Sequence, residues 1–164
     1  MGAGGLGVLT LRSMAPIETR FDEALSGQGF AQIADRNGVA LSMRYQTVWN
    51  ESDFVALHDI PEFLQAAFIT AEDKRFYTHD GIDWRARAQA VVQNVKCLCA
   101  DRGASTISEQ VVRMVIPRPR NLWTRWVEGW EAQRLEHHAT KQDILEFYLN
   151  QVPYAATRRG VVQA

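Results

Sequence analysis

The chain has 164 residues, of which 46% are hydrophobic and 23% are charged. This length suits one domain with a sizeable core, and the composition excludes wholesale disorder and collagen-like repeats. Eighteen basic side chains stand against nineteen acidic ones, which gives a net charge of −1. We therefore expect no nucleic-acid partner, because generic nucleic-acid binders carry a strongly basic surface.

The N-terminal part of the chain predicts a mixture of short elements. Residues 1–11 are glycine-rich and apolar but too short to span a membrane, so we expect a flexible end or the remnant of a longer segment. Residues 16–25 predict a short helix. Further on, Asn37-Gly38 lies between alternating segments, and this pattern predicts a β-hairpin over residues 30–44.

The pattern after Asp59 indicates helices throughout. Four helices are predicted from the residues that cap them: Asp59 with Pro61 starts the first, Asp83 the second, a Thr106–Glu109 capping box the third and a Thr140–Asp143 capping box the last. A further helix is predicted over residues 122–137. The side chains expected on the inner faces are Leu64, Ala67, Phe68 and Ala71; Ala86, Ala90, Val91 and Val95; Ile107, Val111 and Met114; Trp123, Trp126, Val127 and Trp130; and Ile144, Leu145 and Tyr148. The predicted class is mainly α with one small N-terminal β-hairpin.

Glu72 is the first candidate for chemistry. It lies four residues after Phe68 and eight after Leu64, so a helix places all three on one face. An apolar wall beside a carboxylate suits it to proton transfer near neutral pH. The alternative is a glutamate at a helix end that faces water or pairs with Lys74 or Arg75, and the pattern alone favours this alternative.

Small hydroxylated residues precede the helix that starts near Thr106. Ser105 and Thr106 leave backbone N–H groups available for an anion, although the pattern alone favours an ordinary N-cap. The stretch that follows, residues 111–125, is basic and contains no acid; its arginines are Arg113, Arg118, Arg120 and Arg125. It suits a phosphate or an anionic surface, and scattered solvated arginines are the equal alternative.

Arg125 and Glu128 are spaced i, i+3 on the tryptophan-rich helix. Such a pair is commonly a weak surface ion pair. The functional alternative is an arginine for phosphate beside a glutamate that faces a cleft.

Taken in order, these segments resemble four of the five motifs of the peptidoglycan glycosyltransferases, glycosyltransferase family 51. The segments are EDKRFYTHDG at 72–81, GASTISEQ at 103–110, Glu128 on its helix, and KQDILEFYLN at 141–150. The resemblance extends from about Ile33 to Ala164. It places a family domain at 29–164, preceded by an extension or linker at 1–28.

The resemblance implies a lysozyme-like helical fold that works at a membrane surface, on the outer face of the bacterial cytoplasmic membrane. The implied reaction joins lipid II to a growing glycan strand through a β-1,4 bond, with inversion and release of undecaprenyl pyrophosphate. It implies that Glu72 is the general base and that Glu128 helps to hold the pyrophosphate or its metal. Other cell-wall synthesis proteins are the further partners that it suggests.

The resemblance also implies a set of substrate contacts. These residues are Asp73, Lys74, Phe76, His79, Gly81, Ser105, Thr106, Gln110, Arg113 and Arg125. The sequence requires no cofactor, and a divalent cation, Mg²⁺ or Mn²⁺, is an option at Glu128.

Three departures from the family pattern stand out. Thr124-Arg125 replaces the usual Arg-Lys of the third motif, so one cation is lost unless Arg113, Arg118 or Arg120 replaces it. Ser108-Glu109-Gln110 replaces the usual Thr-Gln-Gln. The chain also stops inside the fifth motif, so we expect a C-terminally truncated domain.

Two other functions therefore stay open: a non-catalytic binder of lipid-linked precursor, and a lysozyme-like lytic enzyme.

Overall fold

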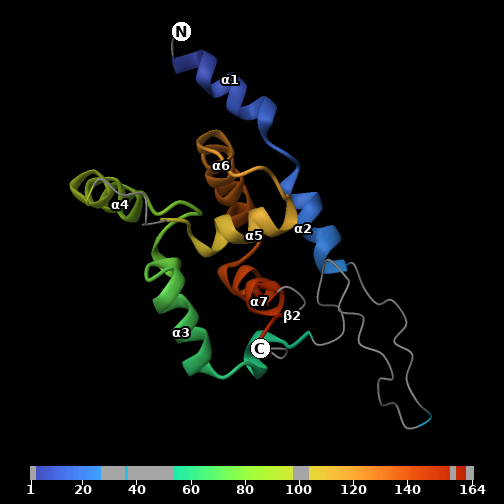
Figure 1. Cartoon of the computed structure of the whole chain (residues 1–164). Helices are drawn as coiled ribbons and strands as arrows, with labels where there is room; N and C mark the ends of the chain where they lie inside the picture. Colours follow the sequence, from blue (N-terminus) through green and yellow to red (C-terminus); the bar gives the residue numbers. More distant parts are fainter. Residues whose placement is uncertain (1–2, 27–35, 37–53, 98–103, 156–157, 162–164) are drawn as a thin grey trace.

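The computed structural model describes residues 3–26, 36, 54–97, 104–155 and 158–161. Its elements in chain order are α1 (Ala3–Ser13), α2 (Ile17–Ser26), the 3₁₀ turn η1 (Leu57–Asp59), α3 (Glu62–Glu72), the 3₁₀ turn η2 (Phe76–Thr78), α4 (Trp84–Cys97), α5 (Ile107–Val115), α6 (Leu122–His138), α7 (Lys141–Gln151), β1 (Pro153–Ala155) and β2 (Arg158–Arg159). The mainly helical class is confirmed (Figure 1). The hairpin predicted over residues 30–44 lies outside the described residues, Arg36 apart.

The core lies where α5, α6 and α7 meet, with α2 packed against them. Both predicted capping boxes form, at Thr106 for α5 and at Thr140 for α7, and each helix begins one residue later. The apolar side chains with no exposed surface in these three helices are Ile107, Val111, Val112, Ala132, Leu135, Ile144, Leu145 and Leu149. Caps of this kind contribute about 1 kcal/mol each, and burial of the apolar faces supplies most of the remaining stability.

The N-terminal segment is helical and is fastened to α6. Residues 3–13 form α1, which corrects the expectation of a flexible end. The backbone N–H of Ala15 donates to Oε1 of Glu131 at 2.6 Å, and Arg134 makes a bidentate pair with Glu18. The side chains of Ile17 and Phe21 in α2 are buried in the core, as the predicted helix requires. A domain boundary at 28/29 stays a prediction.

α4 extends away from the body of the molecule (Figure 1), and it has no buried residue. Val91 and Val95 are 62% and 69% exposed, so the prediction that they point inward is wrong. The reason is that α4 is attached at its first turns, where Trp84 stacks edge-on against Trp126 at 6.5 Å and Arg87 bonds to Glu109. Beyond that point, none of the described helices buries the valine face of α4.

Two further expectations about α3 need correction. The helix begins after Pro61, and Asp59 lies in η1 instead of capping α3. Leu64 and Phe68 are partly buried, but Ala67 and Ala71 are exposed. The inward face of α3 is therefore narrower than its apolar sequence indicates.

A short antiparallel pair of strands, β1 and β2, follows α7 and was not predicted. Gly160 adopts φ +79°, and the next residue, Val161, donates its N–H to the carbonyl of Leu149 at 2.9 Å. A glycine suits this position because other residues rarely adopt such a φ. In the described part of the chain, no helix combines the length and apolarity that a membrane crossing requires.

Candidate active site

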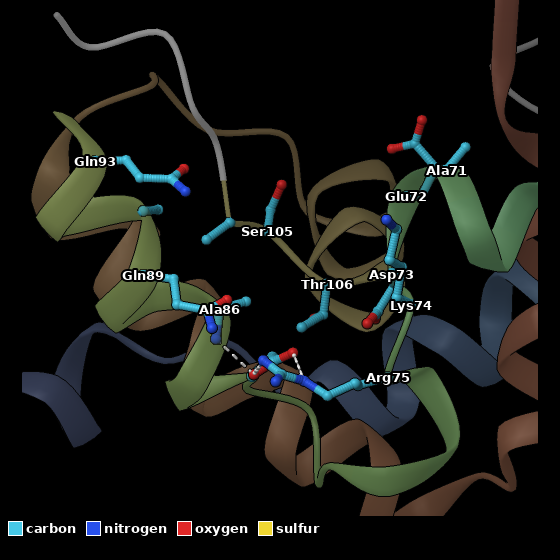
Figure 2. A pocket seen from close by; sticks show the side chains of 13 residues that line it. Ala71, Glu72, Asp73, Lys74, Arg75, Ala86, Gln89, Gln93, Ser105 and Thr106 are labelled. Atoms are coloured by element: carbon cyan, nitrogen blue, oxygen red, sulfur yellow. Dashed lines mark hydrogen bonds and ion pairs between the residues drawn. The ribbon is translucent and has the colours of Figure 1, made fainter. Parts of the chain in front are cut away.

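A cavity of about 370 Å³ opens between the C-terminal end of α3 and the flank of α4. Figure 2 shows Glu72 on one side, Gln89 and Gln93 of α4 on the other, and Ser105 and Thr106 between them. The apolar part of its lining consists of small side chains, Ala71, Ala86, Ala90 and Ala104. The first two sequence motifs, far apart in the chain, thus line one hollow.

Glu72 is the last residue of α3 and its side chain is exposed at the rim of this cavity. Its Oε2 accepts a hydrogen bond from Nε2 of Gln110 on α5 at 3.0 Å. Lys74 also lines the cavity, and no hydrogen bond or ion pair occupies its ammonium group among the described residues. The pairing of Glu72 with Lys74 or Arg75 does not form. The Glu72 carboxylate is therefore accessible from the cavity and is engaged by one neutral donor.

Asp73 points the other way, into the protein, and is 6% exposed. Its Oδ2 accepts from the backbone N–H of Ile107 at 3.0 Å and lies 2.9 Å from Nε2 of His79. The positive N-terminal end of α5 suits this carboxylate. Asp73 and His79 therefore join the first motif to α5 and fix the backbone that carries Glu72.

Phe76 and Gly81 also serve packing in this structure. Phe76 is fully buried, and the ammonium of Lys141 lies 4.4 Å from the centre of its ring. Gly81 adopts φ +77°, and a Cβ there would overlap the backbone of α6 at Ala132 and Gln133. The hydroxyl of Thr106 donates to the carbonyl of Gly81 at 2.6 Å, which ties this turn to the start of α5.

Arg113 and Glu128 form a largely buried ion pair, with Nη2 of Arg113 3.0 Å from Oε2 of Glu128. The prediction that Glu128 pairs with Arg125 or faces a cleft with it is not realised, since Glu128 is 3% exposed. No group of three His, Cys, Asp or Glu side chains suited to a metal ion occurs in the described residues. One carboxylate already engaged by a guanidinium does not fit a divalent cation, and we derive no step through a metal.

Arg125 lies at a second cavity, of about 310 Å³, which shares Ala90 and Ala104 with the first. Leu122 and Trp126 supply apolar lining there. The Arg125 side chain is exposed, and no carboxylate pairs with it in the described part of the chain. It is therefore available to an anion.

Two of the other arginines that could replace the missing cation are already occupied. Arg118 makes two hydrogen bonds, of 2.6 and 2.7 Å, to Glu131, whose side chain is fully buried. Arg113 is held by Glu128. Thr124 itself is part of the N-terminal cap of α6, because its N–H donates to Oδ1 of Asn121 at 2.8 Å. The third-motif position that usually carries a cation thus serves a helix cap here.

α4 contributes residues that the sequence reasoning missed. Arg87 bonds to Glu109, and burial raises the pKa of Glu109 although the guanidinium of Arg87 opposes that effect. At the start of α4, burial alone would raise the pKa of Asp83. The N–H of Ala86 and the guanidinium of Arg75 outweigh it and hold that pKa below its ordinary value. The spacing of Glu109 three residues after Thr106 marked a cap, but nothing in the sequence pointed to Arg87.

Comparison with known proteins agrees with this arrangement. A family-wide sequence profile, described as Transglycosylase, matches residues 38–164. The chain belongs to the transglycosylase family. Over 160 residues, 96% of this chain, it is 31% identical to a penicillin-binding protein 1A/1B of Bacillus subtilis. It is also 38% identical over 107 residues, 63% of this chain, to a monofunctional glycosyltransferase of Staphylococcus aureus strain JH9.

The matched regions are parts of longer proteins. The chain spans 17% of the length of the Bacillus subtilis relative and 38% of the Staphylococcus aureus relative. A penicillin-binding protein 1A of Neisseria cinerea is 41% identical over 113 residues, which is 68% of this chain and 14% of that protein. In this transglycosylase-family chain, Glu72, Lys74 and Ser105 line one cavity and Arg125 lines the adjoining one.

Proposed function

We propose that this chain is a peptidoglycan glycosyltransferase domain that polymerises lipid II. The observation that carries the proposal is the position of the Glu72 side chain. Its exposed carboxylate stands at the rim of a cavity and accepts a hydrogen bond from Gln110, and Lys74, which has no ion-pair partner among the described residues, lines the same cavity. Membership of the transglycosylase family and the names of the relatives support the same activity.

In the proposed reaction Glu72 accepts the proton of the sugar 4-hydroxyl of one lipid II molecule. The hydroxyl oxygen forms a bond to the anomeric carbon of the lipid-linked glycan strand, and the bond from that carbon to the pyrophosphate oxygen breaks. The lipid pyrophosphate leaves with the bonding electron pair, and the attack from the opposite side inverts the anomeric centre. A general base of this kind contributes about 10²–10⁴-fold to the rate.

The leaving group is an anion and needs positive charge more than it needs a proton. The side chains of Lys74 and Arg125 are the best candidates, because each lies at a cavity and neither is engaged by a carboxylate in the described residues. Arg113 and Arg118, by contrast, neutralise Glu128 and Glu131. We therefore assign Arg113 and Glu128 to holding α5 on α6, with Arg125 as the pyrophosphate contact.

The substrates and setting follow from the same proposal. Lipid II and the growing glycan strand bind along the two adjoining cavities, and the chain works at a membrane surface on the outer face of the cytoplasmic membrane. Other cell-wall synthesis proteins are its proposed partners. Ser105, next to the start of α5, is a proposed substrate contact because it lines the first cavity.

One observation favours a second function, a binder of lipid-linked precursor that does not catalyse transfer. Thr124 replaces a cation of the third motif and is committed to the α6 cap. Such a binder would retain affinity for lipid pyrophosphate through Arg125 while forming no polymer.

The deciding experiment incubates the chain with radiolabelled lipid II in detergent and separates the products by gel electrophoresis. The proposed function predicts a ladder of glycan polymers. Retention of lipid II on the protein without any polymer would establish the binder instead. Clearing of purified cell walls by the same preparation, again without polymer, would establish a lytic enzyme and contradict the proposal.

A further inference from the structure

Hydrogen bonds join three side chains from three helices, and the first of them, Glu72, lies at the rim of the first cavity. Glu72 ends α3, Gln110 lies on α5, and Tyr148 lies on α7. Nε2 of Gln110 donates to Oε2 of Glu72 at 3.0 Å, and the hydroxyl of Tyr148 donates to Oε1 of Gln110 at 3.4 Å. The carboxamide therefore connects a buried hydroxyl to the carboxylate.

The position of Tyr148 is fixed by packing. The residue is 2% exposed, and its ring meets the ring of Phe68 edge-on with a centroid distance of 6.2 Å. Phe68 lies one helical turn before Glu72 on α3. Tyr148 thus contacts both α3, which carries Glu72, and the Gln110 amide, which donates to Glu72. These contacts fix the positions of the three side chains relative to one another.

The direction of the hydrogen bonds matters because a carboxamide can turn about its last side-chain bond. With its oxygen facing Glu72, the Gln110 amide would repel the carboxylate instead of donating to it. The carboxylate of Glu72 can only accept, so it selects the orientation that aims the NH₂ group at it, and the Tyr148 hydroxyl then donates to the Oε1 atom on the other side of the amide. Hydrogen bonding to a carboxylate favours its ionised form, which is the form a general base needs.

We propose that Tyr148 is a positioning residue for Glu72, acting through the carboxamide of Gln110. The inference rests on the proposed function for its catalytic meaning, but the hydrogen-bond relay itself is a property of the folded chain. Tyr148 touches neither the cavity lining nor the reacting atoms in this assignment. Its hydroxyl holds the Oε1 end of the Gln110 amide, whose NH₂ group donates to the base.

The first test needs no turnover. In the ¹⁵N-labelled full chain, the side-chain NH₂ signals of Gln110 are assigned by their loss in Gln110→Ala. The relay predicts that these signals shift in Tyr148→Phe and also in Glu72→Gln, whereas the exposed residue change Tyr77→Phe leaves them in place. Unchanged Gln110 signals in both of the first two variants would overturn the proposal.

The second test measures the kinetics of lipid II polymerisation. Tyr148→Phe should lower kcat about tenfold with KM unchanged, the change expected from losing one net hydrogen bond. Gln110→Ala should do the same, and the double variant should be no worse than Gln110→Ala. A parental kcat in Tyr148→Phe, or a change confined to KM, would overturn the relay.

The two proposals can fail separately. An inactive parent chain would contradict the proposed function, and the Gln110 signals would still decide whether the relay exists. If Tyr148→Phe does not fold, as judged by its thermal transition, the shift of the Gln110 signals in Glu72→Gln still tests the contact with Glu72. The kinetics of Gln110→Ala then decide whether the amide serves the base.

Discussion

The carboxylate of Glu128 on α6 and the guanidinium of Arg113 on α5 are 3.0 Å apart, and their side chains are 3% and 24% exposed. Each charge is therefore compensated within the protein. The pair joins the two helices that dominate the core, close to the chain segment where the resemblance places the leaving-group site. Its structural role separates it from Arg125, which lies at the second cavity without a carboxylate partner in the described residues.

Arg113→Ala should lower the free energy of unfolding by about 3 kcal/mol, because it leaves the buried carboxylate of Glu128 without its counter-charge. Arg113→Ala/Glu128→Gln should recover part of this loss, since the double variant leaves no uncompensated charge. Urea denaturation followed by circular dichroism measures both. Equal stability of the parent and Arg113→Ala would show that the pair contributes nothing to the fold.

Arg125→Ala should weaken binding of a soluble lipid pyrophosphate analogue about three- to tenfold. The range is modest because an exposed charge-assisted hydrogen bond is worth less than a buried one. Arg12→Ala is the matched control, since Arg12 is also exposed but lies on α1, outside both cavities. Isothermal titration with the two variants decides the matter, and equal affinities would place the leaving-group site elsewhere.

Gly81→Ala should destabilise the fold by about 3 kcal/mol, because φ +77° strains any other residue and the added Cβ meets the backbone of α6. Gly5→Ala is the control. Apart from its chain neighbours and its own helix backbone, nothing lies within 4 Å of a Cβ at that position, so the change should be neutral or stabilising by up to about 1 kcal/mol. Thermal melting curves compare the two, and similar melting temperatures would contradict the close approach of residues 81 and 132.

The stability of the chain should carry a pH-dependent contribution from Glu109. Burial raises its pKa above the ordinary value of 4.5, so the folded state keeps the proton to higher pH than the unfolded chain does. This contribution therefore becomes less favourable as pH rises from about 4.5 through the raised pKa. Unfolding free energies at intervals from pH 4 to 7 should fall less with pH in Glu109→Gln than in the parent.

Asp83 should contribute to the pH dependence of stability with the opposite sign to Glu109. It therefore serves as a control for a nonspecific effect of acid on the fold. Its pKa is held below the ordinary value of 3.8, so its contribution is present above that pH and is lost as pH falls through the lowered pKa. In Asp83→Asn the loss of stability below about pH 4 should be smaller than in the parent. Identical pH profiles for the parent and both variants would contradict the two assignments.

Local sequence signals predicted the helices that begin with short-range caps. The Thr106–Glu109 and Thr140–Asp143 boxes depend on residues three apart, and both form as expected. The prediction that the valines of α4 point inward was wrong for a different reason. Val91 and Val95 follow helical spacing, but whether such a face is buried depends on a neighbouring helix, which local periodicity does not report.

For the candidate site too, the sequence identified single residues but not the contacts between distant segments. The motif at 72–81 pointed to Glu72, and the structure places this residue at the cavity. The sequence could not show that Asp73 turns inward to the start of α5. Nor could it show that Thr124 is used as a helix cap, or that Tyr148 reaches Gln110. The contacts of Asp73 with Ile107 and of Tyr148 with Gln110 join segments far apart in the chain, so they follow from the packing of the whole chain, whereas the Asn121–Thr124 cap is local to the start of α6.

The central claim is that Glu72 is the general base, and its replacement by glutamine tests it most directly. Glu72→Gln keeps the size of the side chain but cannot accept the proton, while Glu62→Gln makes the same change at the exposed first turn of α3. The measurement is the rate of radiolabelled lipid II polymerisation by both variants, after circular dichroism has shown that both are folded. We predict a loss of about 10²–10⁴-fold for Glu72→Gln and a parental rate for Glu62→Gln. A folded Glu72→Gln chain that polymerises lipid II at the parental rate would contradict the account.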